Sequence, residues 1–188
     1  MPRMRKAAAF ALAYISLLSA ASAETQGPYG IGRTATAAEI AGWNIDVRRD
    51  GRGLPSGSGS VTHGREVFEQ QCAACHGDKG QGGVGDRLVG GQRTLATPNP
   101  VRTVGSFWPY APTLFDYIRR AMPQNAPESL SNNDVYAVSA YILHLNGLLP
   151  AGAVLDSNSM AAIKMPNRNM FTGDSRPDVK NPPCMEHC

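Results

Sequence analysis

The sequence has few cysteines, few aromatic residues and little charge. Of its 188 residues, four are cysteine, 7% are aromatic and 18% are charged, whereas 42% are hydrophobic. The hydrophobic fraction suffices for a core, which excludes a wholly disordered or collagen-like chain, and the length fits one domain. Neither an internal repeat nor strand-like alternation of useful length is present, so we expect a mainly helical fold.

The surplus of positive charge is also small. Lys and Arg number 18 against 15 Asp and Glu, and Arg3, Arg5 and Lys6 account for the whole difference. Binding to a nucleic acid releases counterions and requires an excess of basic residues. The even balance of charge beyond Lys6 therefore disfavours a nucleic-acid-binding protein.

Long apolar runs are missing after residue 20. Before it, the largely apolar stretch Ala7–Ala20 follows the basic residues and precedes the small residues Ala21-Ser22-Ala23. This order predicts a secretory signal peptide at residues 1–23 that is cleaved after Ala23. An uncleaved anchor is less favoured, because such a stretch extends about 21 Å as a helix and the hydrocarbon core is about 30 Å thick. We therefore expect an exported, soluble periplasmic protein.

Helical signals occur in three places. N-cap residues, a first-turn proline and stop signals predict helices over residues 60–71, 109–122 and 131–147. Ser60 and Ser131 are favourable N-caps, and Pro112 suits a first turn. Pro123 and Gly147 follow as stop signals.

The segments that flank these helices contain fewer structural signals. Residues 24–59 are rich in glycine, proline and polar residues, and a capping-box spacing from Thr36 to Glu39 predicts one short helix there. Residues 150–188 show no sustained periodicity. We therefore expect a helical domain at residues 60–149 between an irregular N-terminal extension and an irregular C-terminal arm.

The strongest chemical signal is Cys72-Ala-Ala-Cys75-His76. C-x-x-C-H is the attachment pattern of c-type haem. Two thiols three residues apart at a helix end can reach the two vinyl groups on one porphyrin edge, and the adjacent histidine can then ligate the iron. Three alternatives stay open: a thioredoxin-type dithiol, a Cys72–Cys75 disulfide, and a zinc site that adds Cys184 and Cys188. The first of these needs a βαβ context, which the sequence does not show.

A soft sixth ligand is expected on the far side of the haem. Met122 is the leading candidate, because it lies at the end of the second predicted helix, before Pro123 and 46 residues after His76. Met165, which is also followed by a proline, is its rival. A thioether ligand raises the reduction potential relative to a second histidine and favours a six-coordinate iron.

With these residues in place, the chain resembles class I cytochromes c over about residues 60–149. Gly64 and Phe68 resemble that family's N-terminal helix, and Val138 and Tyr141 resemble its C-terminal helix. The resemblance implies an all-α fold with three main helices around one covalent haem c, here with extended N- and C-terminal segments.

Two further features of that family have counterparts in this sequence. Gly85-Asp86-Arg87-Leu88-Val89-Gly90 resembles its G-P-x-L-x-G loop, with aspartate in place of proline. In the family, the carbonyl of that proline accepts a hydrogen bond from the proximal histidine, and the resemblance implies this role for the Asp86 carbonyl. Trp108 and Tyr110 resemble the aromatic residues that contact the haem propionates, and core packing is the alternative role for both.

A narrower resemblance extends over almost the whole chain beyond residue 23. The segments that carry it are Tyr29–Arg33, Ala38–Trp43, Thr103–Tyr110, Leu114–Pro123 and Lys164–Arg168. They are similar to the cytochrome subunits of sulfite dehydrogenases, including the SoxD-like cytochrome of the Sox sulfur dehydrogenase. The resemblance implies a molybdenum-cofactor subunit as partner, which oxidises a sulfur oxoanion, and a downstream cytochrome or oxidase as acceptor. With one C-x-x-C-H motif, the chain resembles the mono-haem form or the first domain alone of relatives that continue into a second haem domain.

Cys184 and Cys188 do not complete a second haem motif, since no histidine follows Cys188. In an exported protein a disulfide between them is the simplest interpretation, with a bond to a partner chain or a zinc site as alternatives. Its small ring would add little stability, because loop-closure entropy grows with loop length.

We therefore interpret the sequence as a periplasmic mono-haem cytochrome that carries single electrons and has no general acid or base constellation for catalysis of its own. It would serve as the electron-accepting subunit of a molybdenum sulfite or sulfur dehydrogenase. A free-standing soluble carrier is one alternative. A five-coordinate haem enzyme is another, if Met122 is not a ligand.

Overall fold

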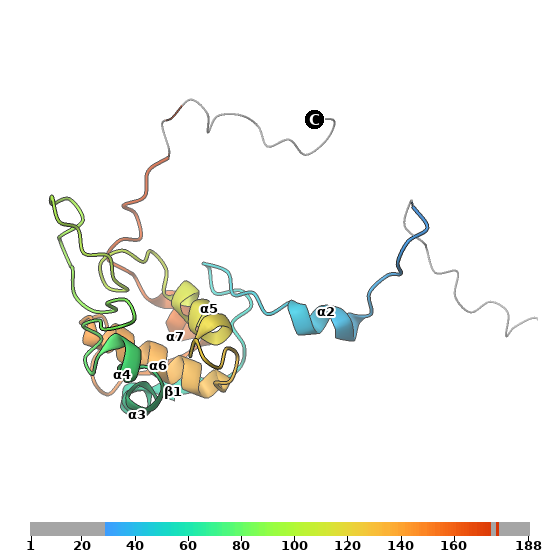
Figure 1. Cartoon of the computed structure of the whole chain (residues 1–188), viewed down its shortest axis with the longest axis horizontal. Helices are drawn as coiled ribbons and strands as arrows, with labels where there is room; N and C mark the ends of the chain where they lie inside the picture. The colour runs from blue at the N-terminus through green and yellow to red at the C-terminus, as the bar shows by residue number, and fades with distance from the viewer. Residues whose placement is uncertain (1–28, 174–175, 177–188) are drawn as a thin grey trace, which may run out of the picture. The chain divides into compact units, whose positions relative to one another are not determined.

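The computed structural model describes residues 29–173 and residue 176, which divide into two compact units, one ending at Ile45 and the other beginning at Asp46. The first unit contains helix α2 (Ala37–Trp43). The second contains, in chain order, β1 (Ser58–Ser60), α3 (Val61–Gln71), α4 (Ala73–His76), α5 (Ala111–Ala121), α6 (Asn132–Leu145), β2 (Val154–Asp156) and α7 (Ser157–Ala162) (Figure 1). In the part of the chain that the structure describes, no helix is long and apolar enough to cross a membrane.

The three longest helices begin and end close to the residues that the sequence signals predict. The hydroxyl of Ser60 accepts a hydrogen bond from the N–H of His63, and that of Ser131 accepts one from the N–H of Asp134. Pro112 lies in the first turn of α5. The predicted helices are thus confirmed, and so is the short α2 helix with its capping box.

Helices α3 and α6 cross in close contact. A Cβ on Gly64 would lie 1.8 Å from the carbonyl oxygen of Ala137, so only glycine lets the two backbones approach this closely. Next to this point, the rings of Phe68 and Tyr141 meet edge to face with their centroids 5.4 Å apart. The crossing fixes the C-terminal end of α3, and therefore the position of the residues that follow it.

Helix α6 is enclosed on all sides rather than along a single apolar stripe. Every residue from Val135 to Leu143 is buried. Helices α3 and α5 and both strands contact α6 (Figure 1). The ring of Tyr136 also packs against Phe115 of α5, with 4.5 Å between their centroids. This central helix organises the core of the second unit.

Two expectations from the sequence need correction. The chain contains a small antiparallel sheet, in which Gly59 of β1 lies opposite Leu155 of β2. Each strand has only three residues, which is too short for a period of two to be visible in the sequence. The C-terminal arm is also not wholly irregular, because Asp156 caps α7 and Met160 of that helix is fully buried. A six-residue helix is likewise too short to establish a helical period.

Candidate haem site

The residues of the C-x-x-C-H motif lie on a single turn of helix. Cys72 ends α3, and its carbonyl oxygen accepts hydrogen bonds from the N–H groups of Cys75 at 3.2 Å and His76 at 3.0 Å. The turn, α4, is followed by Gly77, whose φ of 79° favours glycine. Five consecutive residues thus present two sulfur atoms and one imidazole at the end of a well-packed helix.

The two thiols of the motif differ in their surroundings. Cys72 is half-buried against the hydrophobic core, and burial, followed by the neighbouring Cys75, raises the pKa of the Cys72 thiol to about 11. Cys75 is exposed, and the two sulfur atoms form no disulfide with each other. A thioredoxin-type dithiol needs a βαβ context. Among the described residues the strands β1 and β2 form only an antiparallel pair, which does not provide that context.

His76 is oriented by the loop that follows α4. Its Nδ1 atom donates a hydrogen bond of 2.6 Å to the backbone carbonyl of Asp86, an oxygen that can only accept. The hydrogen bond that the family resemblance predicts is therefore present, with aspartate in the place of proline. With its proton on Nδ1, the ring keeps the Nε2 lone pair available for a metal.

Backbone contacts hold this loop against the motif. The N–H of Gly82 donates to the His76 carbonyl at 2.8 Å, and the N–H of Gly85 donates to the Cys75 carbonyl at 2.8 Å. A Cβ on Gly85 would lie 3.0 Å from Cε1 of the imidazole, so the loop passes directly beside the ring. Together these contacts restrict rotation of the imidazole.

Asn146 anchors the next part of the same loop, and the sequence analysis did not identify it. Its side-chain amide donates to the Leu88 carbonyl at 3.1 Å and to the Ile142 carbonyl at 2.9 Å. Its side-chain oxygen accepts from the N–H of Gly90 at 3.1 Å. The buried asparagine thus joins the loop to the C-terminal end of α6. Its one signal in the sequence is its position before Gly147, which indicates only a helix end.

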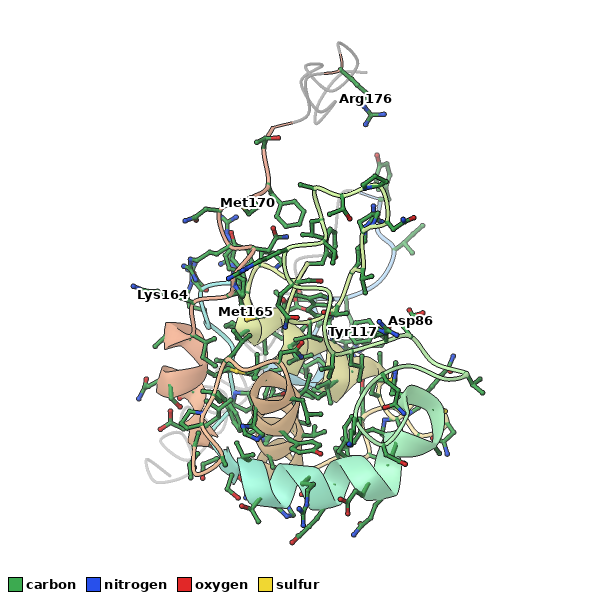
Figure 2. All side chains as sticks on the ribbon, turned by 90° about the vertical axis from the view of Figure 1, so that its left-hand side faces the viewer. Asp86, Tyr117, Lys164, Met165, Met170 and Arg176 are labelled. Atoms are coloured by element: carbon green, nitrogen blue, oxygen red, sulfur yellow. The ribbon has the colours of Figure 1, made fainter. Side chains whose placement is uncertain are left out.

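The two methionines considered as sixth ligand differ in burial. Met122 forms the C-terminal cap of α5 and is partly buried against the core. Met165 follows α7, is only 3% exposed and belongs to the core itself (Figure 2). A haem ligand has to face the haem rather than the protein interior, so this difference favours Met122.

Trp108 and Tyr110 lie just before α5 and are surrounded by aromatic and basic side chains. Trp108 meets Tyr117 of α5 edge to face, with 5.8 Å between the ring centroids. The guanidinium groups of Arg49 and Arg168 lie 5.8 Å and 5.3 Å from the ring centroid of Tyr110. Both arginines are distant from Tyr110 in the sequence, so the fold alone reveals them. Their positive charge suits a site for carboxylate groups such as haem propionates.

The residues around the motif fit a covalently bound haem. Cys72 and Ala73 of the motif and Leu88 of the adjoining loop pack against the core yet keep part of their surface open. That apolar surface suits a porphyrin, whose contact would bury it. Because the Nδ1 atom of His76 is already engaged, its Nε2 atom is the one that suits iron.

Within residues 29–173, no group of three or more His, Cys, Asp or Glu side chains is arranged to hold a metal ion. Cys184 and Cys188, which the zinc alternative and the expected disulfide both use, lie outside the described residues.

Comparison with known proteins places the helical core among haem proteins. The family model described as "Cytochrome C oxidase, cbb3-type, subunit III" matches residues 59–142. A thiosulfate dehydrogenase from Stutzerimonas stutzeri (strain A1501) is 32% identical over 93 residues, which is 47% of this chain. The aligned region spans only 28% of the length of that relative.

The structural comparison covers much more of the chain. The crystal structure of the sulfane dehydrogenase SoxCD from Paracoccus pantotrophus contains a chain that is 40% identical to this one, with a TM-score of 0.75. The match covers 85% of this chain and 81% of that chain. The helical fold expected from the class I cytochrome c resemblance is thereby confirmed. The chain belongs to the SoxD-like c-type cytochromes, which transfer electrons through covalently attached haem c.

Proposed function

We propose that this cytochrome carries single electrons through one haem c, attached by thioether bonds to Cys72 and Cys75, with His76 and Met122 as axial ligands. The hydrogen bond from His76 to the Asp86 carbonyl is the observation that carries the proposal. His76 directly follows Cys75, and both lie with Cys72 on the same helical turn. That combination matches what a haem protein needs of its proximal histidine.

The residues of the chain have distinct roles in this function. When bound, the haem supplies a reversible one-electron couple at its iron. The Asp86 carbonyl keeps the imidazole in one tautomer and raises its basicity as a ligand. Met122 would supply a soft thioether, which raises the potential, and Trp108 and Tyr110 would contact the haem propionates.

The ligand assignment is tested by replacing Met122 with alanine and, as a control, Met170 with alanine. Met170 is 71% exposed, so its replacement should change neither the spectrum nor the potential. Met122→Ala should lose the thioether–iron charge-transfer band of the ferric protein. Its potential should fall, because axial ligands set haem potentials over a range of about 0.8 V. Retention of the band in Met122→Ala would exclude Met122 and make Met165 the next candidate.

We also propose that the protein is exported to the periplasm after removal of residues 1–23 and accepts electrons there from a molybdenum-containing dehydrogenase subunit that oxidises a sulfur oxoanion. Support comes from the relatives, a sulfane dehydrogenase matched over most of its chain and a thiosulfate dehydrogenase matched over part of it. A downstream cytochrome or oxidase would receive the electrons.

Purification of the tagged protein from its native cells tests this partner. We expect molybdenum to copurify in a fixed ratio to haem, and we expect sulfite or thiosulfate to reduce the haem of the isolated complex. A protein that purifies alone and is not reduced by either anion would instead be a free-standing carrier.

A further inference from the structure

The segment from Tyr29 to Asn44, here called the N-terminal arm, exposes an unusual amount of apolar surface. Its own unit leaves four of its large side chains uncovered: Tyr29 is 88% exposed, Ile31 83%, Ile40 51% and Trp43 88%. Helix α2 within the arm buries none of its residues. An exposed apolar group of this size marks an interaction surface rather than a solvated linker.

The arm is nevertheless held in a defined shape by local polar contacts. The N–H of Thr36 donates to the Glu39 carboxylate at 2.8 Å, and the Thr36 hydroxyl accepts from the N–H of Glu39 at 3.3 Å. Arg33 donates to both carboxylate oxygens of Glu39. A helix of seven residues is marginal in water by itself. These contacts offset part of that deficit and reduce the ordering cost when the helix docks.

The apolar side chains of α2 share one face. Ile40 and Trp43 are three residues apart and therefore lie on the same side of the helix. The nearest charges, Arg33 and Glu39, neutralise each other. Such a face fits an apolar groove, in which a helix is anchored by residues at i and i+3, better than it fits a charged surface. Tryptophan is also among the residues most often found at the energetic centre of an interface.

The structural relative also has residues before its haem core. The match to the SoxCD chain includes 85% of 188 residues, or about 160. Residues 60–188 number only about 129, so at least about 31 aligned residues precede residue 60. The haem motif and the helices around it lie beyond that point. A chain of a sulfane dehydrogenase complex therefore has a counterpart to much of the segment that precedes the haem core.

We propose that the N-terminal arm is a docking element that places Ile40 and Trp43 in an apolar groove on the dehydrogenase subunit. The inference rests on the proposed function, which supplies that subunit as the partner. The arm then adds buried area to the contact near the haem and makes the assembly permanent, since transient redox contacts often bury less than about 1,200 Å².

Binding measurements with full-length, haem-loaded cytochrome test the docking role. The molybdenum subunit, isolated from the complex that tagged wild-type protein brings down, is the probe. Trp43→Ala should weaken its binding at least about 30-fold, the effect of a central aromatic anchor. The control is Ala38→Ser, since Ala38 lies on the opposite side of α2, and it should bind within about twofold of wild type. Haem content and the thermal unfolding midpoint should match wild type in both variants, because α2 buries nothing.

The possible results separate the docking role from the proposed function. If wild type brings down molybdenum but Trp43→Ala binds the subunit as tightly, the arm is not the docking element, and the proposed function stands. If wild type brings down no molybdenum, the partner assignment fails and the docking inference fails with it. If Trp43→Ala instead abolishes a dimer of the cytochrome, measured by sedimentation without the subunit, the face belongs to a second copy and the inference is wrong.

Discussion

Replacement of Gly64 by alanine should force α3 away from α6 and destabilise the protein. A Cβ at this position would lie 1.8 Å from the carbonyl oxygen of Ala137 and 2.9 Å from the Cβ of Tyr141. An ordinary contact between carbon and oxygen is about 3.3 Å or longer, so the helices would have to separate by roughly 1.5 Å. The neighbouring edge-to-face contact of Phe68 with Tyr141 would loosen as a result.

The size of the effect follows from two opposing contributions. Alanine is a better helix former than glycine by about 1 kcal/mol, so without the close approach the substitution would stabilise α3. Overpacking of a tight interior typically costs about 1–3 kcal/mol, and here a backbone atom blocks relaxation. We therefore expect a cost at the upper end of this range, about 3 kcal/mol, and a net loss of about 2 kcal/mol in the free energy of unfolding.

Guanidinium chloride unfolding of the haem-loaded protein, followed by far-ultraviolet circular dichroism, measures this loss. Gly42→Ala is the matched control, because nothing lies within 4 Å of a Cβ added to Gly42, which is also helical. It should leave the free energy of unfolding unchanged or raise it by up to about 1 kcal/mol, the gain in helix propensity, and should not lower it. A Gly64→Ala protein as stable as wild type, with an unchanged denaturant slope, would refute the close crossing.

Three further predictions address contacts around this crossing. Asn146→Ala should lower stability by about 2–4 kcal/mol, because it leaves buried loop groups without partners, and urea unfolding measures the loss. Tyr136→Phe should cost about 1 kcal/mol in the same assay, since its hydroxyl donates to the Pro55 carbonyl at 2.8 Å. Hydrogen bonds to Asp134, and then to Glu66, raise the pKa of His63 above 6.5. Its small stabilisation is therefore present below pH 6.5 and disappears as the pH rises through the folded-state pKa, and His63→Gln should remove that part of the pH dependence of unfolding.

The sequence predicts those parts of the molecule whose causes are local. Ser60 and Ser131 identify helix starts because an N-cap acts within three residues. The C-x-x-C-H motif identifies the chemistry because its ligands are consecutive. The hydrogen bond to Asp86 was accessible only through the family resemblance, since aspartate replaces the proline that marks the loop.

Features that depend on contacts distant in sequence could not be predicted. Arg49 and Arg168 both lie over the ring of Tyr110, although one precedes it and the other follows it by about sixty residues. No sequence pattern near either arginine indicates this contact. In the sequence, Asn146 indicates only the end of a helix. Its role in holding the loop at Leu88 becomes visible only in the structure. The two three-residue strands are almost a hundred residues apart in the sequence, with Ser58 paired to Asp156. They are too short for an alternation of polar and apolar residues to be recognised.

The measurement that most directly tests the account is intact mass spectrometry of the protein after maturation in cells that attach haem. We predict a mass that corresponds to one haem per chain, retained under denaturing conditions, and its loss in the Cys72→Ala/Cys75→Ala double variant. A mature wild-type chain without bound haem, or a double variant that keeps it covalently, would contradict attachment at these two residues.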